Sequence, residues 1–178
     1  MDLSKEDIIQ ELEVVLKELT DFCSDINDQL FFQQAPEKWS VAQNVKHLIT
    51  SARMTNLAFS FPKFVIKIYA GKPNRSSRSF DELVAKYKLK LSQGGRASGR
   101  FVPKIISEKE GKENLLHHFS KAMQHVEISI QKKWKDPQLD QYIAPHPLLG
   151  KITLRELCYF TIYHTRHHLE IIKNRVAA

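Results

Sequence analysis

Four stretches of the chain repeat their apolar residues at intervals of three and four, which places those residues on one face of a helix. The first stretch starts at Ser4-Lys-Glu-Asp7, where a serine is followed three residues later by a carboxylate. Leu3 and Ile8 supply the apolar pair that often accompanies such a helix start. We therefore predict an amphipathic helix that packs on a core as far as about Leu30.

The second stretch begins at Ser40-Val-Ala-Gln43, again a capping pattern, and should end near Phe61 because Pro62 follows. Its two faces differ, since one face is apolar and the other carries His47 among small and polar residues. Such a mixture packs poorly in a core but suits the edge of a pocket. The residues that share the face of His47 are Asn44, Ser51, Met54 and Ala58.

The third helix is predicted to start between Ser107 and Lys112 and to continue through Trp134. The last opens at Thr153-Leu-Arg-Glu156, the clearest capping box in the chain. Its inward stripe includes His164 and His168. A second apolar shoulder on this helix is one that a neighbouring helix or a second subunit could cover. That shoulder consists of Cys158, Ile162 and Leu169.

Residues 62–106 form the least regular region, in which a short helix from Ser79 to Leu91 is the one element that a capping pattern indicates. The segment 92–100 is rich in glycine and arginine. It is either a surface loop or a lid whose Arg96 or Arg100 meets an anionic substrate. Residues 144–150 contain two prolines and are predicted to form a braced turn.

The composition is that of an ordinary globular protein, with 42% hydrophobic and 26% charged residues in 178 positions. We expect a single domain over residues 1–178, with an irregular excursion at about 62–106. The net charge of +7 is spread along the chain, so nucleic-acid binding is not favoured.

Two features of the composition bear on location. Cys23 and Cys158 lie in apolar stretches and are interpreted as core thiols in a reducing compartment. The N-terminus has no signal-peptide pattern, and no apolar run approaches the ~20 residues that a membrane span needs. A cytoplasmic protein that acts on a small molecule, without nucleic acid or membrane as partner, is the expectation.

Histidines are the candidate metal-binding residues. His164 and His168 are four residues apart, so their Cβ atoms should lie roughly 6 Å apart on one helix face, where one divalent metal could bind both. Eight histidines in 178 residues make a chance pair plausible, but two unpaired imidazoles on an inward face would be costly. His47, on the other pocket-like face, is the best third ligand. Three imidazoles would leave a coordination position open, as in catalytic metal sites.

Other interpretations of the histidines stay open. Both rings of the pair could instead bond to the backbone or to buried water, with no metal. His167 is expected to flank the site, and His117, His118 and His125 to be solvated. The zincin pattern His-Glu-x-x-His and the Gly-x-Ser-x-Gly nucleophile elbow are both absent from the sequence. No catalytic residue can be assigned.

Three segments resemble the DinB/YfiT-like superfamily of four-helix bundles. Residues 38–48 contain its Trp-Ser pair and a downstream histidine, and residues 146–156 are similar to the turn and cap before its last helix. Residues 164–168 match its His-x-x-His-His ending. The resemblance implies an all-α four-helix bundle with an up-up-down-down-like long crossover between helices two and three. It also implies a frequent homodimer.

The same resemblance implies a function. His47, His164 and His168 would bind one divalent metal, typically nickel or zinc. Some relatives are thiol transferases that use bacillithiol, mycothiol or glutathione, in which the metal would lower the pKa of the attacking thiol. We expect a metal-dependent enzyme, either a transferase of a low-molecular-weight thiol to an electrophile or a hydrolase. The alternative is a non-catalytic module that binds or senses a small molecule or metal.

Overall fold

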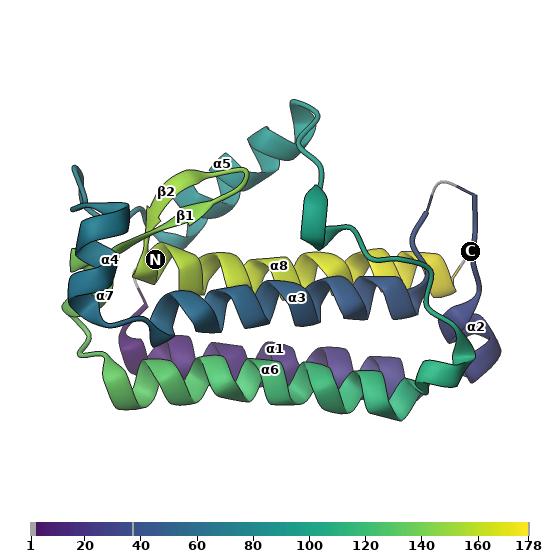
Figure 1. Cartoon of the computed structure of the whole chain (residues 1–178). Coiled ribbons are helices and arrows are strands. Elements are labelled where there is room, and N and C mark those ends of the chain that lie inside the picture. Colours follow the sequence, from purple (N-terminus) through teal and green to yellow (C-terminus); the bar gives the residue numbers. More distant parts are fainter. Residues whose placement is uncertain (1–2, 37, 178) are drawn as a thin grey trace.

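The computed structural model describes residues 3–36 and 38–177, and four long helices dominate it (Figure 1). Each packs against two of the others: α1 and α3 both contact α6 and α8. This closed ring of contacts is a four-helix bundle around one core. The helices are α1 (Lys5–Ser24), α3 (Val41–Ser60), α6 (Lys112–Lys133) and α8 (Leu154–Val176).

Local sequence signals set the start of most helices. Ser4, Ser40, Ser79 and Thr153 each accept a hydrogen bond from the backbone N–H three residues on, and the side chain at that position bonds back. These capping boxes confirm the predicted starts of α1, α3, α5 (Phe80–Ser92) and α8.

The first helix ends earlier than predicted. α1 stops at Ser24, and a separate short helix, α2 (Asp28–Phe32), follows. The Asn27 side chain accepts a hydrogen bond from the N–H of Leu30 at 2.9 Å and so starts α2 as its N-cap. A continuous helix to Leu30 was therefore wrong, because the cap at Asn27 redirects the chain while the apolar spacing continues.

Helix directions alternate differently from the expectation. The Lys112 ammonium donates to the carbonyl of Ser24 at 3.0 Å, so the start of α6 meets the end of α1. The Trp134 indole donates to the carbonyl of Phe59 at 3.0 Å, so α6 and α3 end together. The arrangement is up-down-down-up, not up-up-down-down, as Figure 1 shows. The long crossover between α3 and α6 is confirmed, because parallel helices require the chain to return along their full length.

The crossover is more regular than predicted. It contains α4 (Lys63–Ala70), α5, and the 3₁₀ turns η1 (Gly99–Phe101) and η2 (Glu108–Glu110). Pro62 ends α3 and is also the N-cap of α4. A proline is tolerated there because its missing N–H would have no partner within the helix. The prediction of irregular chain was therefore wrong for α4.

A short α7 (Gln138–Gln141) and a two-stranded hairpin precede α8. The strands β1 (Ile143–His146) and β2 (Gly150–Thr153) are antiparallel, with Ile143 opposite Thr153 and His146 opposite Gly150. The braced turn predicted at 144–150 therefore forms, but as the tip of a hairpin whose strands were not predicted. Hairpin and crossover both lie over the α3/α8 side of the bundle (Figure 1).

A buried carboxylate ties the crossover to α8. Glu156 is fully buried and accepts two hydrogen bonds from the Arg75 guanidinium, both at 2.8 Å. Arg78 donates its backbone N–H at 2.9 Å and its guanidinium at 3.0 Å to the same carboxylate. Burial alone would raise the pKa of Glu156, but these bonds and that from Thr153 bring it below its ordinary value.

Both cysteines and the second apolar group of α8 are buried in the core. Cys23 and Cys158 are buried free thiols, and burial raises the pKa of Cys23 to about 12. Cys158, Ile162 and Leu169 are all covered within the chain, so this shoulder offers no surface to a second subunit. A homodimer stays a prediction from the family resemblance alone. No helix in the described part of the chain is long and apolar enough to cross a membrane.

Candidate metal centre

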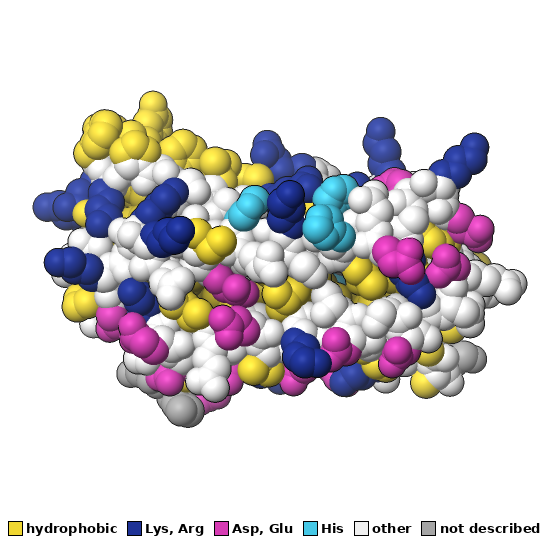
Figure 2. Space-filling model, turned by 90° about the horizontal axis from the view of Figure 1, so that it is seen from below, with side chains coloured by type: hydrophobic (Ala, Val, Ile, Leu, Met, Phe, Trp, Pro, Cys, Tyr) yellow, Lys and Arg dark blue, Asp and Glu magenta, His cyan; other side chains and the backbone are white. Residues whose placement is uncertain are grey.

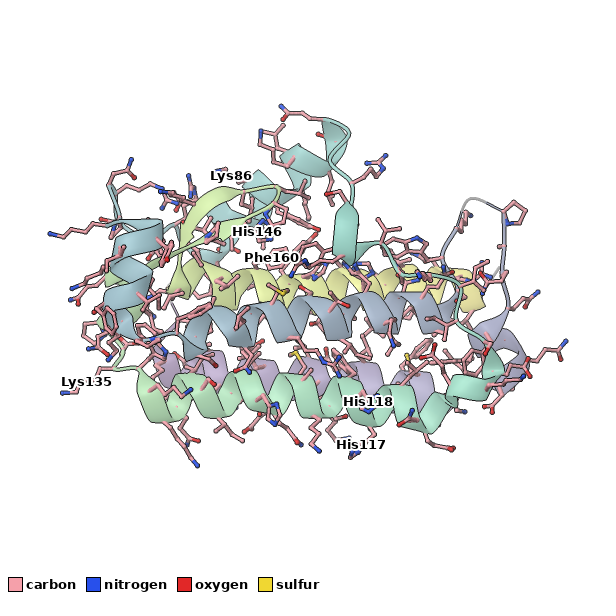
Figure 3. The ribbon with its side chains drawn as sticks, viewed as in Figure 1. Lys86, His117, His118, Lys135, His146 and Phe160 are labelled. Carbon is pink, nitrogen blue, oxygen red and sulfur yellow. The ribbon has the colours of Figure 1, made fainter. Side chains whose placement is uncertain are left out.

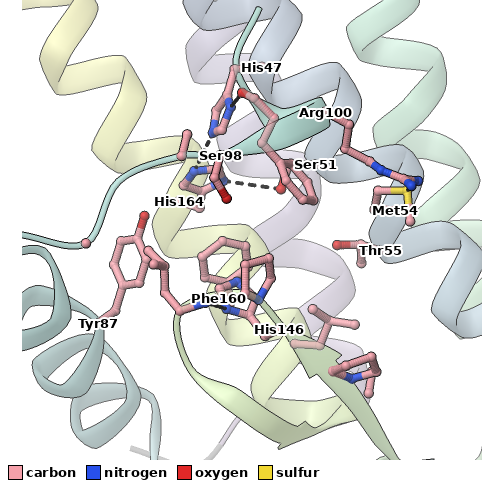
Figure 4. A pocket seen from close by; sticks show the side chains of 18 of the residues that line it. His47, Ser51, Met54, Thr55, Tyr87, Ser98, Arg100, His146, Phe160 and His164 are labelled. Carbon is pink, nitrogen blue, oxygen red and sulfur yellow. Dashed lines mark hydrogen bonds between the residues drawn. The ribbon is translucent and has the colours of Figure 1, made fainter. Parts of the chain in front are cut away.

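The pocket-like face predicted for the second helix does line a cavity. His47 lies on α3, and the residues predicted to share its face all border the same space. The cavity measures about 1800 Å³ and lies between α3 and α8, under η1, the 92–98 loop and the hairpin. Figure 4 shows part of its lining. The predicted residues of this face are Asn44, Ser51, Met54 and Ala58.

Three histidines meet in this cavity. His47 comes from α3, and His164 and His168 come from successive turns of α8. All three are buried, and one ring nitrogen from each lies within 4.8 Å of the other two. The Nε2 atoms of His47 and His164 are 3.0 Å apart. The structure thus brings together the three residues that the sequence singled out.

The other ring nitrogens are held by fixed partners. Nδ1 of His47 donates to the carbonyl of Phe101 at 2.7 Å, and Nδ1 of His168 donates to Oδ1 of Asn44 at 2.7 Å. The amide N–H of Asn44 donates to the carbonyl of Ser40, so its oxygen must face His168. Both acceptors require a proton on Nδ1, which leaves Nε2 of these neutral rings with a free lone pair.

His164 has a more adaptable partner. Its Nδ1 lies 3.4 Å from the hydroxyl of Ser51, which can either donate or accept. Figure 4 shows this contact together with that between His47 and His164. His164 can therefore carry its proton on Nε2, facing His47, or on Nδ1, facing Ser51.

Burial keeps the cluster neutral. It holds the pKa of His164 and His168 well below the ordinary histidine value, and the neighbouring histidines act in the same direction. Burial also lowers the pKa of His47, although the hydrogen bond to Phe101 opposes the shift. Neutral imidazoles are the form that binds a metal.

Aromatic rings fix the orientation of the imidazoles. The Phe160 ring stacks on His164 with centroids 4.6 Å apart, and the half-buried Trp39 is nearly parallel to His168 at 6.2 Å. Trp39 also lies 5.1 Å from the ring of His47. The cluster is therefore held by packing as well as by hydrogen bonds, as a rigid ligand set requires.

His146 is a cavity residue to which the sequence assigned no role. Its Nδ1 accepts the backbone N–H groups of Leu148 and Leu149 at 3.2 and 3.1 Å, so the proton of the neutral ring is on Nε2. Burial lowers its pKa to about 4. Its ring contacts Phe160, with centroids 4.2 Å apart (Figure 3). The two prolines around it signalled the turn, but not that the turn would fold over the cavity.

The remaining histidines lie where they were expected. His167 is half-buried and flanks the cluster, with its ring 5.4 Å from that of His168. His117, His118 and His125 belong to α6; the first and last are exposed, and His118 is half-buried. Figure 3 shows His117 and His118 on the opposite side of the bundle from His146. None of the three borders the cavity.

The residues present fit a divalent metal. One ring nitrogen of each imidazole lies within 4.8 Å of the other two, and the second nitrogen of each ring has an oxygen partner. With the proton of His164 on Nδ1, facing Ser51, all three neutral rings can offer a lone pair to one ion. Histidine ligands in proteins commonly have such outer partners, which fix the tautomer and the ring direction. Three nitrogen ligands beside an open cavity also match the donor set of catalytic rather than structural zinc sites.

Comparison with protein families agrees with this description. The family model described as the DinB superfamily matches residues 6–172, which include all three histidines. The chain therefore belongs to the DinB superfamily. Comparison with curated proteins gives no match.

Proposed function

We propose that the protein is a divalent-metal-dependent enzyme that transfers a low-molecular-weight thiol to an electrophile. His47, His164 and His168 would hold the metal, with zinc or nickel as the expected ion. The observation that carries the proposal is the convergence of three ring nitrogens at the wall of a cavity of about 1800 Å³. A structural metal would not need so large a space beside it.

A divalent metal at this site would supply positive charge that lowers the pKa of a bound thiol. The chain supplies the remaining requirements. Asn44, Ser51 and the Phe101 carbonyl orient the three imidazoles. Burial keeps the imidazoles neutral, and the cavity gives the electrophile room beside them.

Thiol transfer suits the cavity better than hydrolysis does. Among the described residues that line it there is no aspartate or glutamate to act as a general base. A thiol has an ordinary pKa of about 8.5, whereas that of water is 15.7, so the thiol needs far less help to ionise near neutral pH. The hydroxyl of Tyr87, another lining residue, stays protonated because burial raises its pKa to about 12.

Metal binding is the first test. Protein purified without a histidine tag should bind about one equivalent of zinc or nickel, measured by elemental analysis and by titration. His164→Ala should weaken binding by more than about 100-fold, beyond the loss usual for an outer-shell change. His117→Ala, on the exposed face of α6, is the matched control and should bind like the wild type. Equal binding by both variants would disprove the site.

Catalysis is the second test. Metal-loaded and metal-free protein should be incubated with monochlorobimane and, in turn, bacillithiol, mycothiol and glutathione, and conjugate fluorescence followed. Faster conjugation with at least one thiol, lost in His164→Ala, is the expected result. No rate above the metal-free protein with any of the three thiols would refute thiol transfer. With metal binding intact, that outcome would favour the non-catalytic binding or sensing module.

A further inference from the structure

The cavity is much longer than the histidine cluster. From the histidines it continues along α3 to α4, where Leu57, Phe61 and Tyr69 line it and are 42%, 47% and 84% exposed. Figure 2 shows apolar side chains gathered at this end of the molecule, beside basic ones. Its volume of about 1800 Å³ exceeds the ≈ 300–1,000 Å³ of most small-molecule sites. An elongated, largely apolar ligand is the shape that would fill it.

The charged residues of the lining all have one sign. Lys38, Arg96, Arg100 and Arg175 border the cavity, and no carboxylate does so within the described lining. Lys38 and Arg175 lie where α3 begins and α8 ends, whereas the Arg100 guanidinium lies beside Met54, about two turns along α3 from His47 toward α4 (Figure 4). Cationic groups therefore lie on both sides of the histidines, and the lining is apolar from Ala58 toward α4.

Arg100 and Arg175 differ from four arginines elsewhere in the chain. Outside the cavity, arginines on the crossover and on α8 bind carboxylates. Among the described residues, Arg100 instead donates to the sulfur of Met54, at 3.7 Å, and to no carboxylate. Arg175 donates to the carbonyl of Gln33, and no described residue accepts from its buried Nε. The arginines paired with carboxylates are Arg75, Arg78, Arg155 and Arg166.

We propose that the cavity binds an amphipathic anion: an extended apolar or aromatic body that carries one carboxylate, sulfonate or phosphate. Arg100 binds the anionic group beside Met54, and the apolar body lies toward α4. Guanidinium groups without carboxylate partners favour such anions, and the apolar lining favours the body. The inference rests on the proposed function, because it names the substrate class of the same site.

Two fluorescent probes with nearly the same aromatic body distinguish the contribution of the charge to binding affinity from that of apolar contact. 8-Anilino-1-naphthalenesulfonate carries a sulfonate, and N-phenyl-1-naphthylamine is neutral. Titrated into the metal-free protein, the sulfonate should bind about tenfold more tightly, as one charge-assisted hydrogen bond would provide. The advantage should shrink as salt is raised, because the arginines are in part exposed. Equal affinities at low salt would overturn the proposal.

Variants locate the two parts of the site. Arg100→Gln should weaken sulfonate binding about five- to tenfold and leave the neutral probe unchanged. Arg53→Gln, an exposed α3 position outside the cavity, is the matched control. Ala58→Trp, which fills the middle of the cavity, should weaken both probes. If neither probe responds to Ala58→Trp, they bind elsewhere and the assignment is wrong.

The design separates this inference from the proposed function. The probe titrations use metal-free protein, and His164→Ala, which removes a metal ligand, should keep its preference for the sulfonate. If the protein binds metal but does not prefer the sulfonate probe, the amphipathic-anion proposal is wrong and the proposed function is unaffected. If the protein prefers the sulfonate probe but binds no metal, the proposed thiol transfer is wrong and the cavity is an anion-binding site.

Discussion

The two sides of the bundle differ in what they bury. Apart from Ser129 on α6, every fully buried polar side chain of the four long helices, among the described residues, lies on α3 or α8. None lies on α1. The α1/α6 side carries its polar groups on the surface, where ion pairs such as Lys17 with Asp21 are largely exposed. The α1/α6 side of the bundle therefore packs almost entirely through apolar side chains.

On the α3/α8 side the polar groups bond to one another. The hydroxyls of Thr55 and Thr161 are 3.2 Å apart across the two helices, and Asn44 bonds to His168. Burying such groups costs free energy unless each finds a partner. Their concentration on two adjacent helices, beside the cavity, marks the side that is organised for binding. Of the seven histidines on helices, three are buried among these polar groups: His47, His164 and His168.

The strongest contrast concerns the buried carboxylate that fastens the crossover to α8. Glu156→Gln keeps the shape but removes the charge that Arg75 and Arg78 bind, and we expect about 2–3 kcal/mol loss of unfolding free energy. Glu11→Gln removes a half-exposed partner of Arg166 and should cost less than about 1 kcal/mol. Urea unfolding of both variants measures the difference. Equal losses would show that burial adds nothing to this ion pair.

A smaller effect tests whether Asn44 serves the histidines. Asn44→Leu removes the acceptor for Nδ1 of His168, so that ring can turn or change tautomer. We expect metal affinity to fall about 10- to 100-fold, with the ligands themselves unchanged.

The control for Asn44 is Thr55→Val. This change removes a buried hydroxyl from the same helix that bonds Thr161 and no histidine. Metal titration of Thr55→Val should match the wild type. A similar loss in both variants would mean that helix packing, rather than the outer hydrogen bond, sets the affinity.

Sequence patterns predicted the part of the fold that local interactions determine. The capping boxes at Ser4, Ser40 and Thr153 involve residues three apart, so the starts of three bundle helices could be read directly. The placement of His47 on a poorly packing helix face identified a cavity wall for the same reason. Helix ends were harder, since Asn27 competes with a continuing apolar pattern.

Contacts between distant segments were beyond this reasoning. The Phe101 carbonyl reaches His47 across 54 residues of sequence, through a crossover whose path no local signal fixes. That no described carboxylate binds Arg100 likewise depends on where distant segments fold. The sequence offered Arg100 as one of two candidates for meeting an anion, and the structure adds that it borders the cavity. The three histidines that cluster were therefore predictable from the sequence, whereas their hydrogen-bond partners were not.

The smallest predicted effect concerns a half-buried carboxylate on the α1/α6 side. Oε1 of Glu127 on α6 has no hydrogen-bond partner among the described residues, and burial, aided by Glu13, raises the pKa of Glu127 to about 7 from 4.5. Between these values the folded protein holds a proton that the unfolded chain has lost. The contribution of Glu127 to the unfolding free energy should therefore fall as pH rises from 4.5 to about 7 and level off above that.

Glu127→Gln removes this dependence. The variant should match the wild type at pH 4 and exceed it at pH 8, by less than about 1 kcal/mol because solvent reaches part of the side chain. Glu113→Gln, at an exposed position of the same helix, should follow the wild-type curve. Urea unfolding at both pH values decides the matter. If Glu127→Gln is instead less stable than the wild type at pH 8, the ionised carboxylate of Glu127 has a favourable partner. The α1/α6 side would then contain a stabilising polar interaction below its surface.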